Sequence, residues 1–93
     1  MKLFLLTQPP SSRYDTFDCC VVCAESAEAA KLIHPSGLLV WHGDDWWWDE
    51  KRFPSEPAND QSWTSPDKVF VTYLGEATSD LSSGVVLASL HAG

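Results

Sequence analysis

One ten-residue stretch constrains the fold of this chain more than any other part of the sequence. It is Trp41-His42-Gly43-Asp44-Asp45-Trp46-Trp47-Trp48-Asp49-Glu50. It holds four of the five tryptophans and four carboxylates, and it contains no Lys or Arg. Consecutive side chains diverge in a strand and fan out around a helix, so three adjacent indoles cannot all enter one core. Since Trp is the residue most enriched at binding hot spots, we expect this stretch to form a recognition surface.

Two compatible interpretations of this stretch stay open. In the first, the indoles anchor in a pocket of a partner protein while the carboxylates steer the chain toward a basic surface. In the second, two indoles cover the face of a sheet opposite a helix, and the acids keep the segment soluble. The candidate partner-binding residues are Trp41, Asp44, Asp45, Trp46, Trp47, Trp48, Asp49 and Glu50.

Length and charge limit the classes of function. The 93 residues form one small domain, 1–93, and their formal net charge is −7. A surface this acidic repels nucleic-acid phosphates and anionic membranes and favours basic protein surfaces. We therefore expect a protein partner and no direct nucleic-acid or membrane binding. The charge also allows imitation of DNA, although most domains of this charge are simply soluble.

The amino terminus and the cysteines both indicate a cytoplasmic protein. The apolar run Leu3-Phe4-Leu5-Leu6 ends after four residues, which is shorter than the roughly 7–15 residues of a signal peptide. The three cysteines, Cys19, Cys20 and Cys23, are an odd number within five residues and do not form a disulfide framework. Reduced thiols are typical of the cytoplasm.

Hydrophobic patterning predicts an α+β fold. We expect a mostly antiparallel sheet of about four strands in the order β-β-α-β-β, with one helix packed on it and a long Trp-rich acidic loop. Ser26 is the expected N-cap of a helix of about two turns, with His34 as a cation near its carboxyl end. So small a sheet has edge strands, which allow two copies to pair as a homodimer. The expected strands are 2–8, 14–24, 38–41, 68–77 and 85–90, and the irregular segment is 42–66.

Metal binding and catalysis are both disfavoured by the sequence. Cys20 and Cys23 have the spacing of half a zinc knuckle, but residues three apart in a strand point to opposite faces, so we expect core packing instead. His42 beside Asp44 and Asp45 is the one local acid–base cluster. The sequence has no phosphate loop, nucleophile elbow or His-Glu-x-x-His motif. We therefore expect no metal, no cofactor and no enzymatic activity.

A small-ligand alternative depends on one pair of cations. Indoles stack on nucleobases, and Lys51-Arg52 next to the tryptophans can contact the phosphates of a nucleotide signal. The surrounding acids oppose this interpretation, so we place a nucleotide sponge below protein binding.

The chain resembles a group of small phage and prophage accessory proteins, mostly without assigned function. The matching residues are Lys2-Leu3-Phe4-Leu5-Leu6-Thr7-Gln8, Tyr14-Asp15-Thr16-Phe17-Asp18, Ala24-Glu25-Ser26, Ala29-Ala30-Lys31-Leu32-Ile33-His34-Pro35, Trp63, Leu74-Gly75-Glu76-Ala77, Val85-Val86-Leu87-Ala88-Ser89 and Ala92-Gly93. The resemblance implies a phage-encoded protein that acts in the bacterial cytoplasm. By analogy of size and charge with inhibitors of host defence, including anti-CRISPR proteins, we expect it to inhibit a bacterial defence protein by stoichiometric binding.

Overall fold

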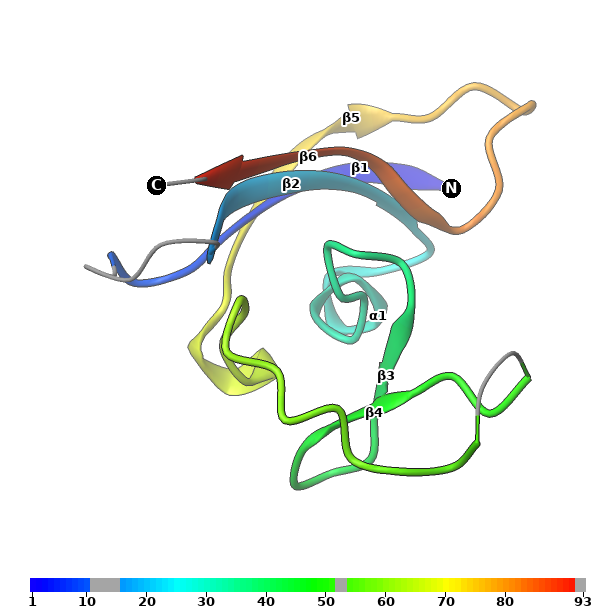
Figure 1. Cartoon of the computed structure of the whole chain (residues 1–93). Helices are drawn as coiled ribbons and strands as arrows, with labels where there is room; N and C mark the ends of the chain where they lie inside the picture. Colours follow the sequence, from blue (N-terminus) through cyan, green and yellow to red (C-terminus); the bar gives the residue numbers. More distant parts are fainter. Residues whose placement is uncertain (11–15, 52–53, 92–93) are drawn as a thin grey trace.

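The amino-terminal apolar segments form the centre of a four-stranded sheet. In the computed structural model, which describes residues 1–10, 16–51 and 54–91, strand β1 (Lys2–Thr7) pairs antiparallel with β2 (Thr16–Ala24). Strand β5 (Phe70–Glu76) adds to β1 and strand β6 (Gly84–His91) adds to β2, also antiparallel. The resulting order is β5-β1-β2-β6 (Figure 1). The expected α+β class is confirmed, and β2 is an inner strand; residues 14 and 15 of the predicted second strand lie outside the described residues.

The predicted helix is present and is shorter than expected. Helix α1 (Ala27–Lys31) begins after Ser26, whose Oγ accepts a hydrogen bond from the Ala29 N–H at 3.1 Å. The helix ends at the C-cap Leu32, and His34 lies in the following turn rather than in the last helical turn. Proline disfavours helical geometry in the residue before it, and Pro35 follows His34 directly. No helix in the described part of the chain is long and apolar enough to cross a membrane.

The segment predicted to be irregular contains regular structure. Strand β3 (Leu39–Trp41) pairs antiparallel with β4 (Trp46–Trp48), so Trp41 lies opposite Trp46 in a separate two-stranded sheet. Pro57 bridges to Trp47 on the other side of β4. A short 3-10 helix, η1 (Pro66–Lys68), precedes β5. The prediction of 42–66 as wholly irregular was wrong because aromatic residues favour pleated structure, and three residues suffice where neighbouring segments complete the ladder.

All additional elements lie on one face of the main sheet. Helix α1, the β3–β4 hairpin and the segment leading to η1 gather beneath it, and none of the described helices or strands lies on the opposite face (Figure 1). Trp46 and Trp63 belong to the same core cluster as Ala30 of α1. The interpretation in which indoles cover the face opposite the helix was therefore wrong. The core cluster comprises Phe4, Leu6, Cys20, Val22, Ala24, Ala30, Leu39, Trp46, Trp63 and Val69.

Candidate functional site

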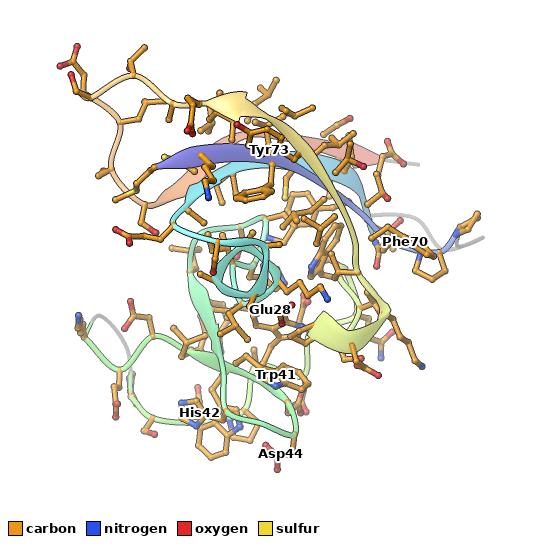
Figure 2. The ribbon with its side chains drawn as sticks, turned by 180° about the vertical axis from the view of Figure 1, so that it is seen from behind. Glu28, Trp41, His42, Asp44, Phe70 and Tyr73 are labelled. Carbon is orange, nitrogen blue, oxygen red and sulfur yellow. The ribbon has the colours of Figure 1, made fainter. Side chains whose placement is uncertain are left out.

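The turn of the β3–β4 hairpin presents the first acids of the tryptophan-rich stretch. The His42 N–H donates to the Asp45 carbonyl at 3.1 Å and closes the turn, while Gly43 adopts a φ of 95° that favours glycine. Asp45 Oδ1 accepts a hydrogen bond from the Trp46 N–H at 2.8 Å. Asp44 has no such role and is exposed. Trp41, His42 and Asp44 lie at the end of the molecule remote from the sheet (Figure 2).

The first tryptophan of the triplet belongs to the core. Trp46 is 2% exposed, and its Nε1–H donates to the Thr64 carbonyl at 3.0 Å. Its ring meets His34 at 4.9 Å and Trp41 at 5.3 Å in edge-to-face geometry. A side chain held in this way is not available to a partner. Trp46 therefore positions the hairpin and does not itself form the recognition surface.

The second tryptophan points the other way. Trp47 is half-buried and stacks on the exposed His42, with 4.7 Å between ring centroids and an interplanar angle of 13°. The Trp47 Nε1 atom is buried and has no hydrogen-bond partner among the described residues. Trp41 and Trp48 are half-buried and pack against the core. The alternation of a strand thus leaves the His42–Trp47 stack as the aromatic surface at this end of the molecule.

The remaining two acids directly follow β4, at the end of the hairpin opposite to the turn that carries Asp44. Glu50 is exposed, and the half-buried Asp49 uses Oδ1 to accept a hydrogen bond from the Lys51 N–H at 3.1 Å. The predicted partner-binding acids therefore lie at the two ends of the hairpin, Asp44 and Asp45 in its turn and Asp49 and Glu50 after β4, in the layer beneath the main sheet (Figure 1). We call the exposed or half-buried group on the hairpin and directly after it the acidic hairpin surface: its members are His42, Asp44, Asp45, Trp47, Asp49 and Glu50.

The cation pair of the nucleotide alternative gains no support from this arrangement. Lys51 is exposed and directly follows Asp49 and Glu50 in the chain, and Arg52 lies outside the described residues. Two cavities adjoin Lys2 instead, one beside Glu25 and Glu76 and one at the start of α1. Nucleotide binding through Lys51 and Arg52 stays a prediction.

A buried histidine fixes the base of the hairpin, and sequence reasoning missed it. His34 is 1% exposed, and its Nδ1 accepts from the Ser36 N–H at 3.1 Å and lies 2.9 Å from the Ser36 Oγ. Because Nδ1 accepts, Nε2 carries the proton and donates to Asp60 Oδ2 at 2.7 Å. Burial raises the pKa of Asp60, but hydrogen bonds from His34 and Ser62 outweigh burial and hold that pKa below its ordinary value. The expected role of His34 as a helix-terminal cation was wrong.

A glutamine of the main sheet holds the same segment from the other side. Gln8 Nε2 donates to the carbonyls of Phe17 at 2.7 Å and Ser62 at 3.0 Å, and Gln8 Oε1 accepts from the Thr64 N–H at 2.9 Å. Thr64 is the residue whose carbonyl accepts the Trp46 indole N–H. Hydrogen bonds between residues far apart in the sequence therefore connect the sheet, the 60–64 segment and the hairpin into one rigid base.

The hydrogen-bonded side chains of Asp60, His34 and Ser36 have the donor and acceptor types of a hydrolase catalytic relay, but their other hydrogen bonds indicate a structural role. We call the Asp60–His34 hydrogen bond the clamp. The Ser36 Oγ also accepts from the Leu38 N–H at 3.2 Å, and the Ser36 N–H shares the imidazole Nδ1. The Ser36 hydroxyl is thus hydrogen-bonded within the 34–38 segment. The cavities beside Lys2 are not lined by these side chains. The Asp60–His34–Ser36 hydrogen bonds orient the 60–64 segment.

The cysteines pack as predicted and do not gather around a site. Cys20 lies in the core, where burial, with a further contribution from Cys19, raises the pKa of its thiol to about 12. Cys23 is buried on the opposite face of β2, where its Sγ donates to the Met1 Sδ at 3.6 Å. Within the described ranges, no group of three or more His, Cys, Asp or Glu residues is arranged to hold a metal ion.

Comparison of the chain with models of protein families, with curated proteins and with solved structures gives no match. The resemblance to phage accessory proteins stays a prediction from the sequence.

Proposed function

We propose that this protein is a phage-type inhibitor that binds a basic surface of a bacterial defence protein through its acidic hairpin surface. The observation that carries the proposal is the His42–Trp47 stack, on the same hairpin as the exposed carboxylates of Asp44, in its turn, and Glu50, after β4. A flat aromatic contact combined with unpaired carboxylates suits a partner that offers Lys or Arg side chains.

The rigid base of the hairpin supports this proposal. Ordering a flexible loop on binding costs free energy, and a surface that is already ordered avoids that cost. Here the Trp46 indole, the Asp60–His34 hydrogen bond and the Gln8 side chain hold the hairpin before any partner arrives. The acids then contribute mainly to the rate and specificity of association, and the aromatic stack contributes contact area.

A charge-reversal experiment tests the proposal. The tagged protein is used to capture partners from bacteria that carry defence systems, and a captured protein is identified by mass spectrometry, purified and titrated by calorimetry. We expect one partner at a fixed stoichiometry, with affinity that falls as salt is raised. Asp44→Lys with Glu50→Lys is expected to weaken binding by about 100-fold, because both carboxylates face the basic surface.

The matched control reverses two exposed acids elsewhere. Glu25→Lys with Asp80→Lys gives the same net charge but leaves the hairpin unchanged, and we expect it to bind within about threefold of the original protein. Trp47→Ala separates the aromatic contribution from the charge. Equal loss of affinity in the two charge-reversed variants, or no loss in the hairpin variant, would contradict the proposal.

A further inference from the structure

The outer face of the main sheet is apolar and largely exposed, except at Cys23, which is buried beside Met1. Phe4, Leu6, Cys20 and Val22 enter the core, so the residues that alternate with them on β1 and β2 face away from it. The pairing places Thr72, Leu5, Val21 and Leu87 in one row across all four strands. Leu87 is 68% exposed, and Phe70, which lies opposite Thr7, is 62% exposed. We call Leu3, Leu5, Thr7, Cys19, Val21, Phe70, Thr72, Leu87 and Ser89 the outer sheet face.

The centre of this face carries no charged side chain, although the protein as a whole is strongly acidic. The carboxylate of Asp18 lies at its border, at a bulge near the start of β2, and accepts a hydrogen bond from Ser89 at 3.5 Å. A basic partner would find no carboxylate at the centre of this face, and burial of an unpaired Lys or Arg is costly. The surface is therefore complementary to another uncharged apolar surface.

The most exposed large apolar side chains of this face are Leu87 and Phe70. Contact between two such faces removes these side chains from water in both copies. Because each face is a single sheet of a 93-residue chain, the contact is small and fits a weak, reversible dimer.

We propose that the outer sheet face binds a second copy of this chain, so that two sheets stack into a β-sandwich. Antiparallel sheets pack face to face about 10 Å apart with apolar side chains interdigitated, and each copy supplies such a layer. The acidic hairpin surface lies on the far side of each copy (Figure 1), so face-to-face contact keeps the most acidic segments of two −7 chains apart. The dimer would present two hairpins, one at each end.

Molar mass as a function of concentration tests this proposal. Light scattering coupled to size exclusion, over about 1 to about 200 µM chain, is expected to show a reversible shift from 10.3 kDa toward twice that mass. Leu87→Lys places a charge on the stacked face and is expected to raise the dimer dissociation constant by about 100-fold or more. Because Leu87 is exposed in the single chain, this variant is expected to fold normally.

The control is Leu32→Lys, which introduces the same charge at a leucine that is 52% exposed on the helix layer. It is expected to leave the dimer unchanged. Pairing through the edge of β6 would use backbone groups, so a dimer that persists in Leu87→Lys would overturn face-to-face stacking and indicate edge pairing. A mass of 10.3 kDa throughout the concentration range would also overturn the proposal and leave the face to a different protein.

Discussion

The two ends of this molecule differ in charge and in the way that they are held. The acidic hairpin surface combines carboxylates with the His42–Trp47 stack, whereas the outer sheet face is uncharged around Leu5, Val21 and Leu87. Side-chain hydrogen bonds from distant segments hold the hairpin, and backbone pairing between strands forms the sheet face. A domain of 93 residues can thus carry two surfaces with different partners, because one layer of core separates them.

The largest expected effect comes from removing the indole that joins the hairpin to the core. Trp46→Ala is expected to reduce the free energy of unfolding by about 3–5 kcal/mol, since it leaves a cavity and an unpaired Thr64 carbonyl. Urea unfolding followed by circular dichroism measures this change. Trp47→Ala is the control and is expected to lose at most about 1 kcal/mol, because its ring lies on the outer side of the hairpin. Equal losses of unfolding free energy in the two variants would contradict the assignment of Trp46 to the core and Trp47 to the outer side of β4.

A smaller effect is expected at the clamp beneath the hairpin. Asp60→Asn removes a charge-assisted hydrogen bond to His34 and is expected to reduce the free energy of unfolding by about 1–3 kcal/mol near neutral pH. Asp44→Asn, on the exposed turn, is expected to change it by less than about 0.5 kcal/mol. The two variants compare a carboxylate that holds the hairpin with one that faces outward.

The same clamp predicts how stability depends on pH. The folded state lowers the pKa of Asp60, so its carboxylate stabilises the fold above the unfolded-state value of about 3.9. This contribution is lost as the pH falls through the lowered, folded-state pKa. Urea unfolding from about pH 7 to about pH 3 is therefore expected to show a shallower loss of stability in Asp60→Asn than in the original protein. Identical slopes in the two proteins would contradict the role of the clamp.

The smallest expected effect concerns the thiols of β2. Cys20 is buried with a thiol pKa of about 12, so it is expected to resist alkylation of the folded protein at neutral pH. Cys19 is half-buried on the outer sheet face and is expected to react, more slowly at high protein concentration because the dimer covers it. Mass spectrometry of the alkylated protein measures both rates. A Cys19 rate independent of concentration would argue against stacking through this face.

The strands of the main sheet were predictable because the alternation and apolar runs that mark a strand lie within a few consecutive residues. Alternation over 68–77 and the apolar segments 2–8 and 14–24 predicted three strands of the sheet, and the apolar character of both faces of β2 predicted an inner strand. The sequence did not indicate that one of those faces would lack a cover, because an apolar pattern does not say which element packs on it. Strand β4 was missed, since the nearby Gly43 and Pro57 are residue types that usually mark turns and loops.

The candidate site was predictable only in part. The composition of 41–50 indicated an acidic, aromatic surface, and the period of a strand explains why Trp46 and Trp47 take opposite sides. The clamp joins His34 to Asp60 across 26 residues, and Gln8 reaches Thr64 across 56. Contacts at such separations have no local pattern. A buried polar pair such as His34–Asp60 forms because the folded chain brings the two residues together, and a single sequence does not show which distant residues meet.

The central claim is that the two ends of the molecule act independently, one on a foreign basic protein and one on a second copy. The most direct test measures partner affinity by calorimetry and self-association by light scattering on the same three proteins. Asp44→Lys with Glu50→Lys is expected to lose the partner and still dimerise, and Leu87→Lys is expected to lose the dimer and still bind the partner. A variant that loses both activities while its fold stays intact would contradict the claim.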